Sequence, residues 1–257
     1  MNWLAYEHYG YAALAALGTL VAVWLVGRVL HGPGAQGWLD RWRGVVPPFI
    51  NVNAMLFGLT LAFIANDTWS ARDRAMDAVF READTLRSLI VLAEAAPGGQ
   101  GGALAGAIRA YGQASATEFS ALRQRDLDPR ASNAADELLR MAADPGFATA
   151  MGEPVQSVVL AKVVQLRDDR DLRVSLSRTH LNPLKWLGMA ALGFLTILSI
   201  AAVHIGAPRA AMAAIWLFAL AAAPSAAIVL VQGNPFQEPA AISPAPILEA
   251  VSVSGLH

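Results

Sequence analysis

Four apolar stretches, each about as long as a membrane-spanning helix, alternate with polar segments along the 257-residue chain. A helix crosses the hydrocarbon core of a bilayer with roughly 20 consecutive apolar residues. The stretches lie near residues 9–30, 46–65, 186–204 and 210–231. Because an even number of spans returns the chain to its starting side, we expect both termini and the long segment between spans 2 and 3 on one side of the membrane.

This long segment is predicted to be a bundle of helices outside the membrane. Apolar residues recur at three- and four-residue steps from Met76 to Ala93, which is the period of an amphipathic helix. Since no Gly or Pro separates this pattern from the second span, we expect one helix to leave the membrane and continue as a stalk to about Ala95. Further helices are expected near residues 104–122, after a cap at Ser132 or Asn133, and from Pro154 into the third span, with a kink or stop at Pro183.

The predicted fold is an all-α membrane protein with four transmembrane helices, a helical-bundle insert between spans 2 and 3, and stalk helices continuous with those two spans. The expected divisions are residues 1–66 for transmembrane helices 1 and 2, 67–184 for the insert, 185–232 for transmembrane helices 3 and 4, and 233–257 for an extended C-terminal tail. Prolines and an Asn-Pro pair disfavour helix in the tail. The tail could pack against the base of the stalk or be disordered.

Composition excludes several classes of function. Only 15% of the residues are charged, against about 25% in soluble domains, and the net charge of −1 gives no field that favours nucleic acid. The chain has no Cys, so disulfides and thiolate chemistry are excluded. With no paired His and no nucleotide-binding or nucleophile motif, we expect no enzyme, no cofactor and no metal site.

Charged residues within the predicted insert are interpreted as solvated helix faces. This interpretation covers the carboxylates of Glu82, Asp84 and Glu94 and the mixed run at residues 167–178. In that run, residues 167 and 171, and residues 169 and 173, have opposite charges at a spacing of four, so each pair is expected to meet on the helix surface.

Polar residues interrupt the second span on a single helical face. The residues that share this face, at steps of four and three, are Asn53, Phe57, Thr60, Ile64 and Asp67. Polar side chains in lipid are costly and tend to face protein or water. The face could line a pore, with Phe57 and Ile64 as a constriction and Asp67 repeated as a carboxylate ring. Alternatively, Asn53 and Thr60 hydrogen-bond between helices, Phe57 and Ile64 face lipid, and Asp67 is an ordinary interfacial acid.

Basic residues set the expected orientation. They flank the two short connections between spans, whereas the terminal tails have none: the residues are Arg28, Arg41, Arg43 and Arg209. The short loops are therefore expected in the cytoplasm, and the insert and both termini outside it. The first eight residues carry only Glu7 as a formal charge, so the first span is interpreted as a retained anchor and not as a cleaved signal.

The stretch FGLTLAFIANDTWSARDRAMDAVFREADTLRSLIVLA resembles the bestrophin-like family of bacterial membrane proteins. The resemblance rests on Leu61-Ala62-Phe63, on Trp69, on Glu82-Ala83, on Pro235-Phe236 and on Ser243-Pro244. Two spans, a helical insert and two spans match over nearly the whole chain. Ser70 after Trp69, and Gln237 and Glu238 after Phe236, depart from the family pattern. The chain also lacks the acidic calcium clasp of bestrophins, so it offers no case for calcium gating.

The resemblance implies a bacterial inner-membrane protein that is remotely related to the pentameric bestrophin anion channels. The leading hypothesis is an oligomeric ion channel, a pentamer by analogy, whose second span faces the symmetry axis. Its partners would be the bilayer, inorganic ions and further copies of the chain, and not nucleic acid. The alternative is a non-conducting sensor or assembly protein whose insert binds a ligand or partner. A channel needs its polar face at the subunit axis, whereas a sensor would carry its polar cluster in the insert.

Overall fold

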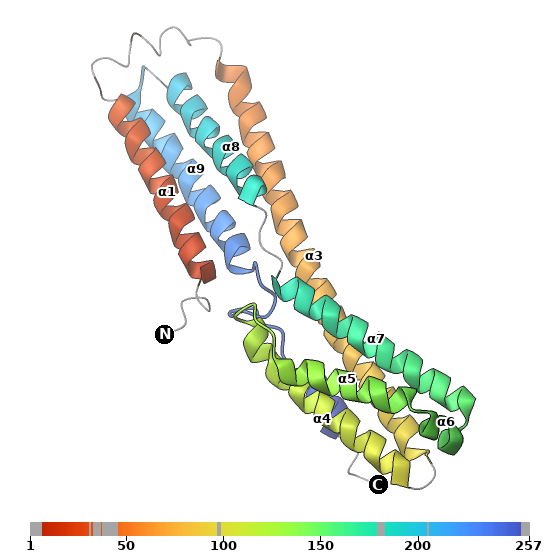
Figure 1. Ribbon diagram of the computed structural model, residues 1–257. Coiled ribbons are helices and arrows are strands. Elements are labelled where there is room, and N and C mark those ends of the chain that lie inside the picture. Colours follow the sequence, from red (N-terminus) through yellow and green to blue (C-terminus); the bar gives the residue numbers. More distant parts are fainter. Residues whose placement is uncertain are drawn as a thin grey trace. The chain divides into compact units, whose positions relative to one another are not determined.

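The computed structural model describes residues 7–30, 32, 37, 46–96, 99–178, 183–204 and 206–252, and nearly all of them are helical (Figure 1). No strand occurs among these residues. The helices are α1 (Glu7–Leu30), α3 (Val46–Glu94), α4 (Gly99–Leu122), α5 (Pro129–Ala143), α6 (Pro145–Met151), α7 (Glu153–Arg178), α8 (Pro183–Val203), α9 (Pro208–Val231) and α10 (Ala245–Ser252). The prediction of an all-α membrane protein is confirmed.

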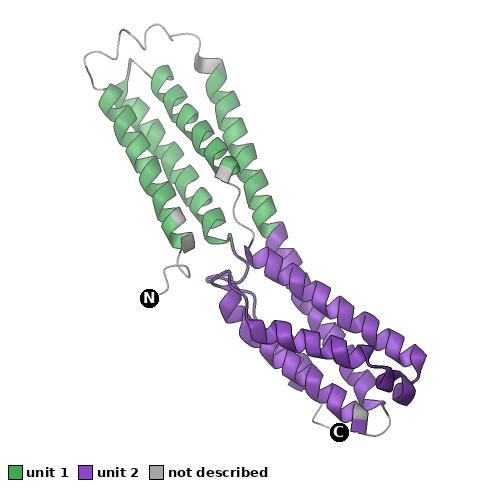
Figure 2. Ribbon diagram, in the orientation of Figure 1, with its two compact units in different colours: residues 1–69, 180–233 green, residues 70–179, 234–257 purple. Residues whose placement is uncertain are grey.

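The chain divides into two compact units (Figure 2). Unit 1 consists of Met1–Trp69 and His180–Gly233, and unit 2 consists of Ser70–Thr179 and Asn234–His257. The division assigns the C-terminal residues to the same unit as the insert.

Among the residues that the structure describes, four helices are long and apolar enough to cross a membrane, in agreement with the four expected spans. Helix α9 packs against both α1 and α8. Apolar side chains of these three helices form one buried cluster, which comprises Val23, Val26, Ile197, Ile200, Ala201, Ala211, Ile215 and Ala219. A second cluster joins α3 to α8 and α9 and comprises Ile64, Ala65, Met189, Ala226 and Val229.

Helix α3 runs for 49 residues without interruption, which confirms that the second span continues as a stalk. The physical reason is the one given by the sequence, since no helix-breaking residue lies between Ala65 and Met76. The continuity expected at the third span falls on residues 179–182, which lie outside the described residues. On either side of them, α7 ends at Arg178 and α8 begins at Pro183, a position that suits the first turn of a helix.

Unit 2 is a helical bundle in which α4 packs on α5 and α5 packs on α7, around one buried apolar cluster to which α3 also contributes. The cap of α5 was predicted at Ser132 or Asn133, and this prediction is wrong. The Asp128 carboxylate accepts a 2.9 Å hydrogen bond from the backbone N–H of Arg130, and Pro129 occupies the first turn. A carboxylate cap followed by Pro is a strong helix start, and it places the helix N-terminus before Ser132.

The C-terminal tail is not extended throughout, because Ala245–Ser252 forms helix α10. Pro246 lies in its first turn, where the missing N–H is not needed. Ile247, Ala250 and Val251 are buried in the core of unit 2, where α10 packs on α4. The burial of this apolar face stabilises a helix that the neighbouring prolines alone would not predict.

The segment before α10 is fixed to unit 2 by specific contacts. The Asn234 side chain donates a 3.0 Å hydrogen bond to the carbonyl of Leu122 and accepts one from the N–H of Phe236. The Phe236 ring meets the Phe119 ring edge-on, with 5.5 Å between centroids. Of the two alternatives for the tail, packing against the insert is the one that the structure has.

Candidate functional site

The predicted polar face of the second span is placed largely against other helices of unit 1. The amide of Asn53 donates a 3.0 Å hydrogen bond to the hydroxyl of Ser199 on α8. Ser199 in turn donates to the carbonyl of Leu195, one turn earlier on the same helix. This is the interhelical bond that the second interpretation of Asn53 predicts.

The apolar residues of the same face also pack against other helices of unit 1. The Phe57 ring meets the Phe218 ring of α9 edge-on, with a centroid distance of 5.3 Å. A Cβ at Gly193 would lie only 3.2 Å from Phe57, so this glycine allows α3 and α8 to approach closely. Ile64 is 4% exposed and belongs to the buried cluster with Met189. The pore-lining role of these residues stays a prediction, because the single chain shows only their packing within one copy.

The polar end of this face is electrostatically compensated. The Lys185 ammonium donates to the Asp67 carboxylate, and about half of each side chain is exposed. Two residues further on, the Trp69 indole donates a 2.9 Å hydrogen bond to the Gln232 side chain. A ring of Asp67 carboxylates would therefore be a ring of ion pairs. Thr60, between Phe57 and Ile64 on this face, is half-buried.

The opposite face of α3 is exposed along the whole span. We call it the outer stripe; its residues, at steps of four, three and four, are Met55, Leu59, Ala62 and Asn66. Met55 is 73% exposed and Leu59 is 50% exposed. The small residue Gly58 next to this stripe is also exposed. In a membrane, such a stripe can face lipid, another copy of the chain, or the centre of an assembly.

The largest polar cluster among the described residues lies in the core of unit 2. We call it the buried charge network; its charged members are Glu82 of α3, Glu118 of α4, and Arg170 and Arg173 of α7, each at most 6% exposed. The guanidinium of Arg173 lies between the two carboxylates, 3.2 Å from Glu82 Oε2 and 3.1 Å from Glu118 Oε2. The second guanidinium, of Arg170, reaches Glu118 Oε1 at 2.5 Å. Two positive and two negative charges thus compensate each other.

Neutral groups also donate hydrogen bonds to this network. The Tyr111 and Ser115 hydroxyls both donate to Glu82 Oε1, at 2.8 and 2.5 Å. Burial, reinforced by the Glu82 charge, raises the pKa of the Tyr111 hydroxyl well above its ordinary value, so Tyr111 remains a donor at any physiological pH. Burial works against the charged form of Arg170, but the hydrogen bond and charge of Glu118 outweigh it and raise the pKa of Arg170. Arg173 also lies over the Phe119 ring, 4.6 Å from its centroid.

These buried charges correct two interpretations of the sequence. Glu82 is not on a solvated face, and Arg173 pairs with Glu82 and Glu118 and not with Asp169. Asp169 instead reaches Arg81 at 2.8 Å. The other expected surface pair, Arg167 with Asp171, is also wrong, since Arg167 reaches Asp136 at 3.1 Å and Asp171 lies 3.8 Å from Arg170.

One signal in the sequence could have found the network. The buried stripe of α7 keeps its spacing of four and three residues straight through the charges: Val159, Val163, Leu166, Arg170, Arg173 and Ser177. A charge that stays in register with an apolar stripe points into the core and not to solvent.

The fold and the two polar regions define an all-α membrane protein with four spans and a helical insert that has its own core. The sequence matches the Bestrophin-like domain family over residues 13–247, which is nearly the whole chain. The chain therefore belongs to the Bestrophin-like family, as its motifs indicated. No curated protein and no solved structure matched it.

Proposed function

We propose that the protein is an oligomeric ion channel in which the outer stripe of α3 lines the pore. Two observations support this: the chain belongs to the Bestrophin-like family, and α3 holds to its own subunit by one face and exposes the other. The exposed face of α3, which ends at Asn66, is the observation that carries the proposal. Copies of the chain around a symmetry axis would bring these stripes together; the subunit number, five, is proposed by analogy alone.

The stripe suggests how conduction would be controlled. Met55 and Leu59 would form apolar rings, and a narrow apolar ring blocks ions because water leaves it. In this arrangement Asn53, Phe57 and Ile64 would hold α3 in place. The competing version of the same proposal places the pore on the face predicted from the sequence, which consists of these three residues with Thr60 and Asp67.

Bilayer current from purified, reconstituted protein tests both versions. Leu59→Ser should raise the current at rest if the outer stripe is the constriction, because a hydroxyl keeps the ring wet. Leu217→Ser on α9, at a position that is 70% exposed, is the matched control and should not change it. If Ile64→Ala raises the resting current and Leu59→Ser does not, the pore lies on the face that packs within the subunit. Absence of current at every voltage and pH would overturn the channel proposal.

The proposed location is the bacterial inner membrane, with the short loops in the cytoplasm and the insert and termini outside. Since the native chain has no Cys, single cysteines report this topology without background. Ser120→Cys, at an exposed position of the insert, should react with an impermeant thiol reagent on intact cells, and Gly37→Cys should not. The reverse pattern would invert the topology.

The second candidate is a non-conducting sensor or assembly protein, and the buried charge network favours it. The network lies in the insert, which is where a sensor would carry its polar cluster. The charges of the network already pair with each other. If the purified protein conducts no current while charge-neutralising changes in the network alter its assembly, this candidate is supported. That the chain is not an enzyme stays a prediction.

A further inference from the structure

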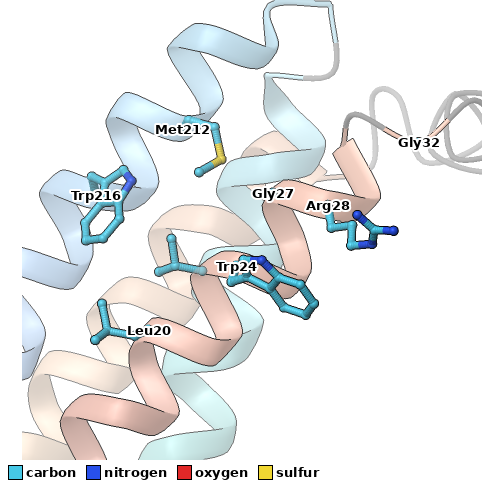
Figure 3. A pocket seen from close by; sticks show the side chains of 8 residues that line it. Leu20, Trp24, Gly27, Arg28, Gly32, Met212 and Trp216 are labelled. Atoms are coloured by element: carbon cyan, nitrogen blue, oxygen red, sulfur yellow. The ribbon is translucent and has the colours of Figure 1, made fainter.

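A groove lies between α1 and α9 within unit 1, near the end of α1 that carries Arg28 (Figure 3). Its volume is about 680 Å³, and it is open along one side. Leu20, Trp24 and Arg28 project from α1, and Met212 and Trp216 from α9. A volume of this size falls in the range of small-molecule sites, roughly 300–1,000 Å³.

The close approach of the two helices depends on a glycine. A Cβ at Gly27 would lie 3.2 Å from both the sulfur and the terminal carbon of Met212, so this contact closes the groove at its base. Above the base, the indole rings of Trp24 and Trp216 are 62% and 43% exposed. Two large aromatic surfaces thus face outward from a concave apolar floor.

The charge near the groove is positive. Arg28 lies in the last turn of α1. Arg209 is exposed and lies one turn before Met212, so it falls on nearly the same face of α9. Helices α8 and α9 contain no acidic residue, and the one acid of α1, Glu7, is at its other end.

We propose that this groove binds a phospholipid with an anionic headgroup. Its phosphate would lie at Arg28 and Arg209, and its acyl chains would lie along Leu20, Trp24 and Trp216. A lipid fits better than a soluble anion, because most of the lining belongs to the candidate spans Ala12–Val29 and Pro208–Val231 and the groove opens sideways from them. The cytoplasmic placement expected for this end matches the leaflet in which anionic lipids attract Arg and Lys.

The test measures bound lipid on the full-length protein in detergent. Phosphatidylglycerol and phosphatidylcholine are titrated separately, and bound lipid is counted by native mass spectrometry. Arg28→Gln should weaken phosphatidylglycerol binding about fivefold, the effect of one basic group near an anionic headgroup. Leu20→Trp should fill the groove and abolish binding of that lipid. Higher salt should reduce the preference for phosphatidylglycerol.

Two matched controls accompany these variants. Arg87→Gln removes an exposed Arg of unit 2, and Leu17→Trp adds the same bulk at an exposed position of α1 outside the groove; neither should change binding. Equal binding of both lipids to the wild-type protein would overturn the proposal, and so would equal effects of Arg28→Gln and Arg87→Gln. If Leu20→Trp instead changes the subunit number and leaves bound lipid unchanged, the groove is a contact between copies of the chain.

Discussion

Removal of the central guanidinium of the buried charge network should strongly lower the stability of unit 2. Arg173→Met keeps an apolar chain of similar length but leaves Glu82 and Glu118 with a single compensating charge, that of Arg170. Arg173 is fully buried, so water cannot replace the lost contacts at 3.2 and 3.1 Å. Breaking a buried ion pair by removing one partner typically costs about 3–5 kcal/mol.

Hydrogen–deuterium exchange of the amides of α4 around Ser115 measures this cost. If these amides exchange through opening of unit 2, a loss of about 3–5 kcal/mol accelerates their exchange roughly 150- to 5,000-fold. Arg167→Met is the matched control on the same helix, since its pair with Asp136 is exposed on both sides, at 38% and 49%. An exposed pair contributes at most about 1 kcal/mol, so exchange should rise by no more than about fivefold.

A double substitution separates charge from packing. Glu82→Gln in the Arg173→Met protein removes the uncompensated carboxylate and retains an oxygen for the Tyr111 and Ser115 hydroxyls. The double variant should therefore exchange more slowly than Arg173→Met alone. The reasoning is refuted if Arg173→Met exchanges like Arg167→Met, or if the two effects simply add.

Two further predictions concern a helix contact and a helix cap in unit 2. Gly112→Ala should release α10 from α4, because a Cβ at Gly112 would overlap the Val251 side chain. Limited proteolysis should then cut the C-terminal segment faster. Gly106→Ala adds its Cβ to open space on the same helix and should not change the rate of cleavage. Asp128→Ala should cost about 1 kcal/mol of stability at neutral pH, measured by thermal unfolding. The hydrogen bonds from Arg130 lower the pKa of Asp128 in the folded protein, so its contribution is complete above the unfolded pKa of about 3.9 and is lost as the pH falls through the folded value. Wild type and variant should therefore converge in acid, and a difference that persists there would show that the cap acts without its charge.

The helices were predictable because their signals are local. The length of the apolar stretches gives the spans, and the absence of Gly and Pro between Ala65 and Met76 gives the unbroken α3. Whether the Asn53 face of α3 packs on other helices of the same chain or lines a pore was not predictable, because polar side chains in a membrane can face either protein or water. The hydroxyl of Ser199, 146 residues away in the chain, decides that Asn53 points inward. Helix α10 was missed for the same reason, since its stability comes from burial against α4.

Local charge compensation constrains how this protein could act on ions. Within the described residues, Asp67 is offset by Lys185, and the charges of the buried network offset each other. Opposite charges in contact leave little field beyond the Debye length, about 10 Å at 0.1 M salt. A pore along the outer stripe would therefore select ions mainly by the cost of removing their water at Met55 and Leu59, and not by a charged ring. Asp67→Asn would leave the Lys185 charge uncompensated, so the end of the span at this pair would become more positive. The pair would therefore determine the charge balance there even if neither side chain touches a permeating ion.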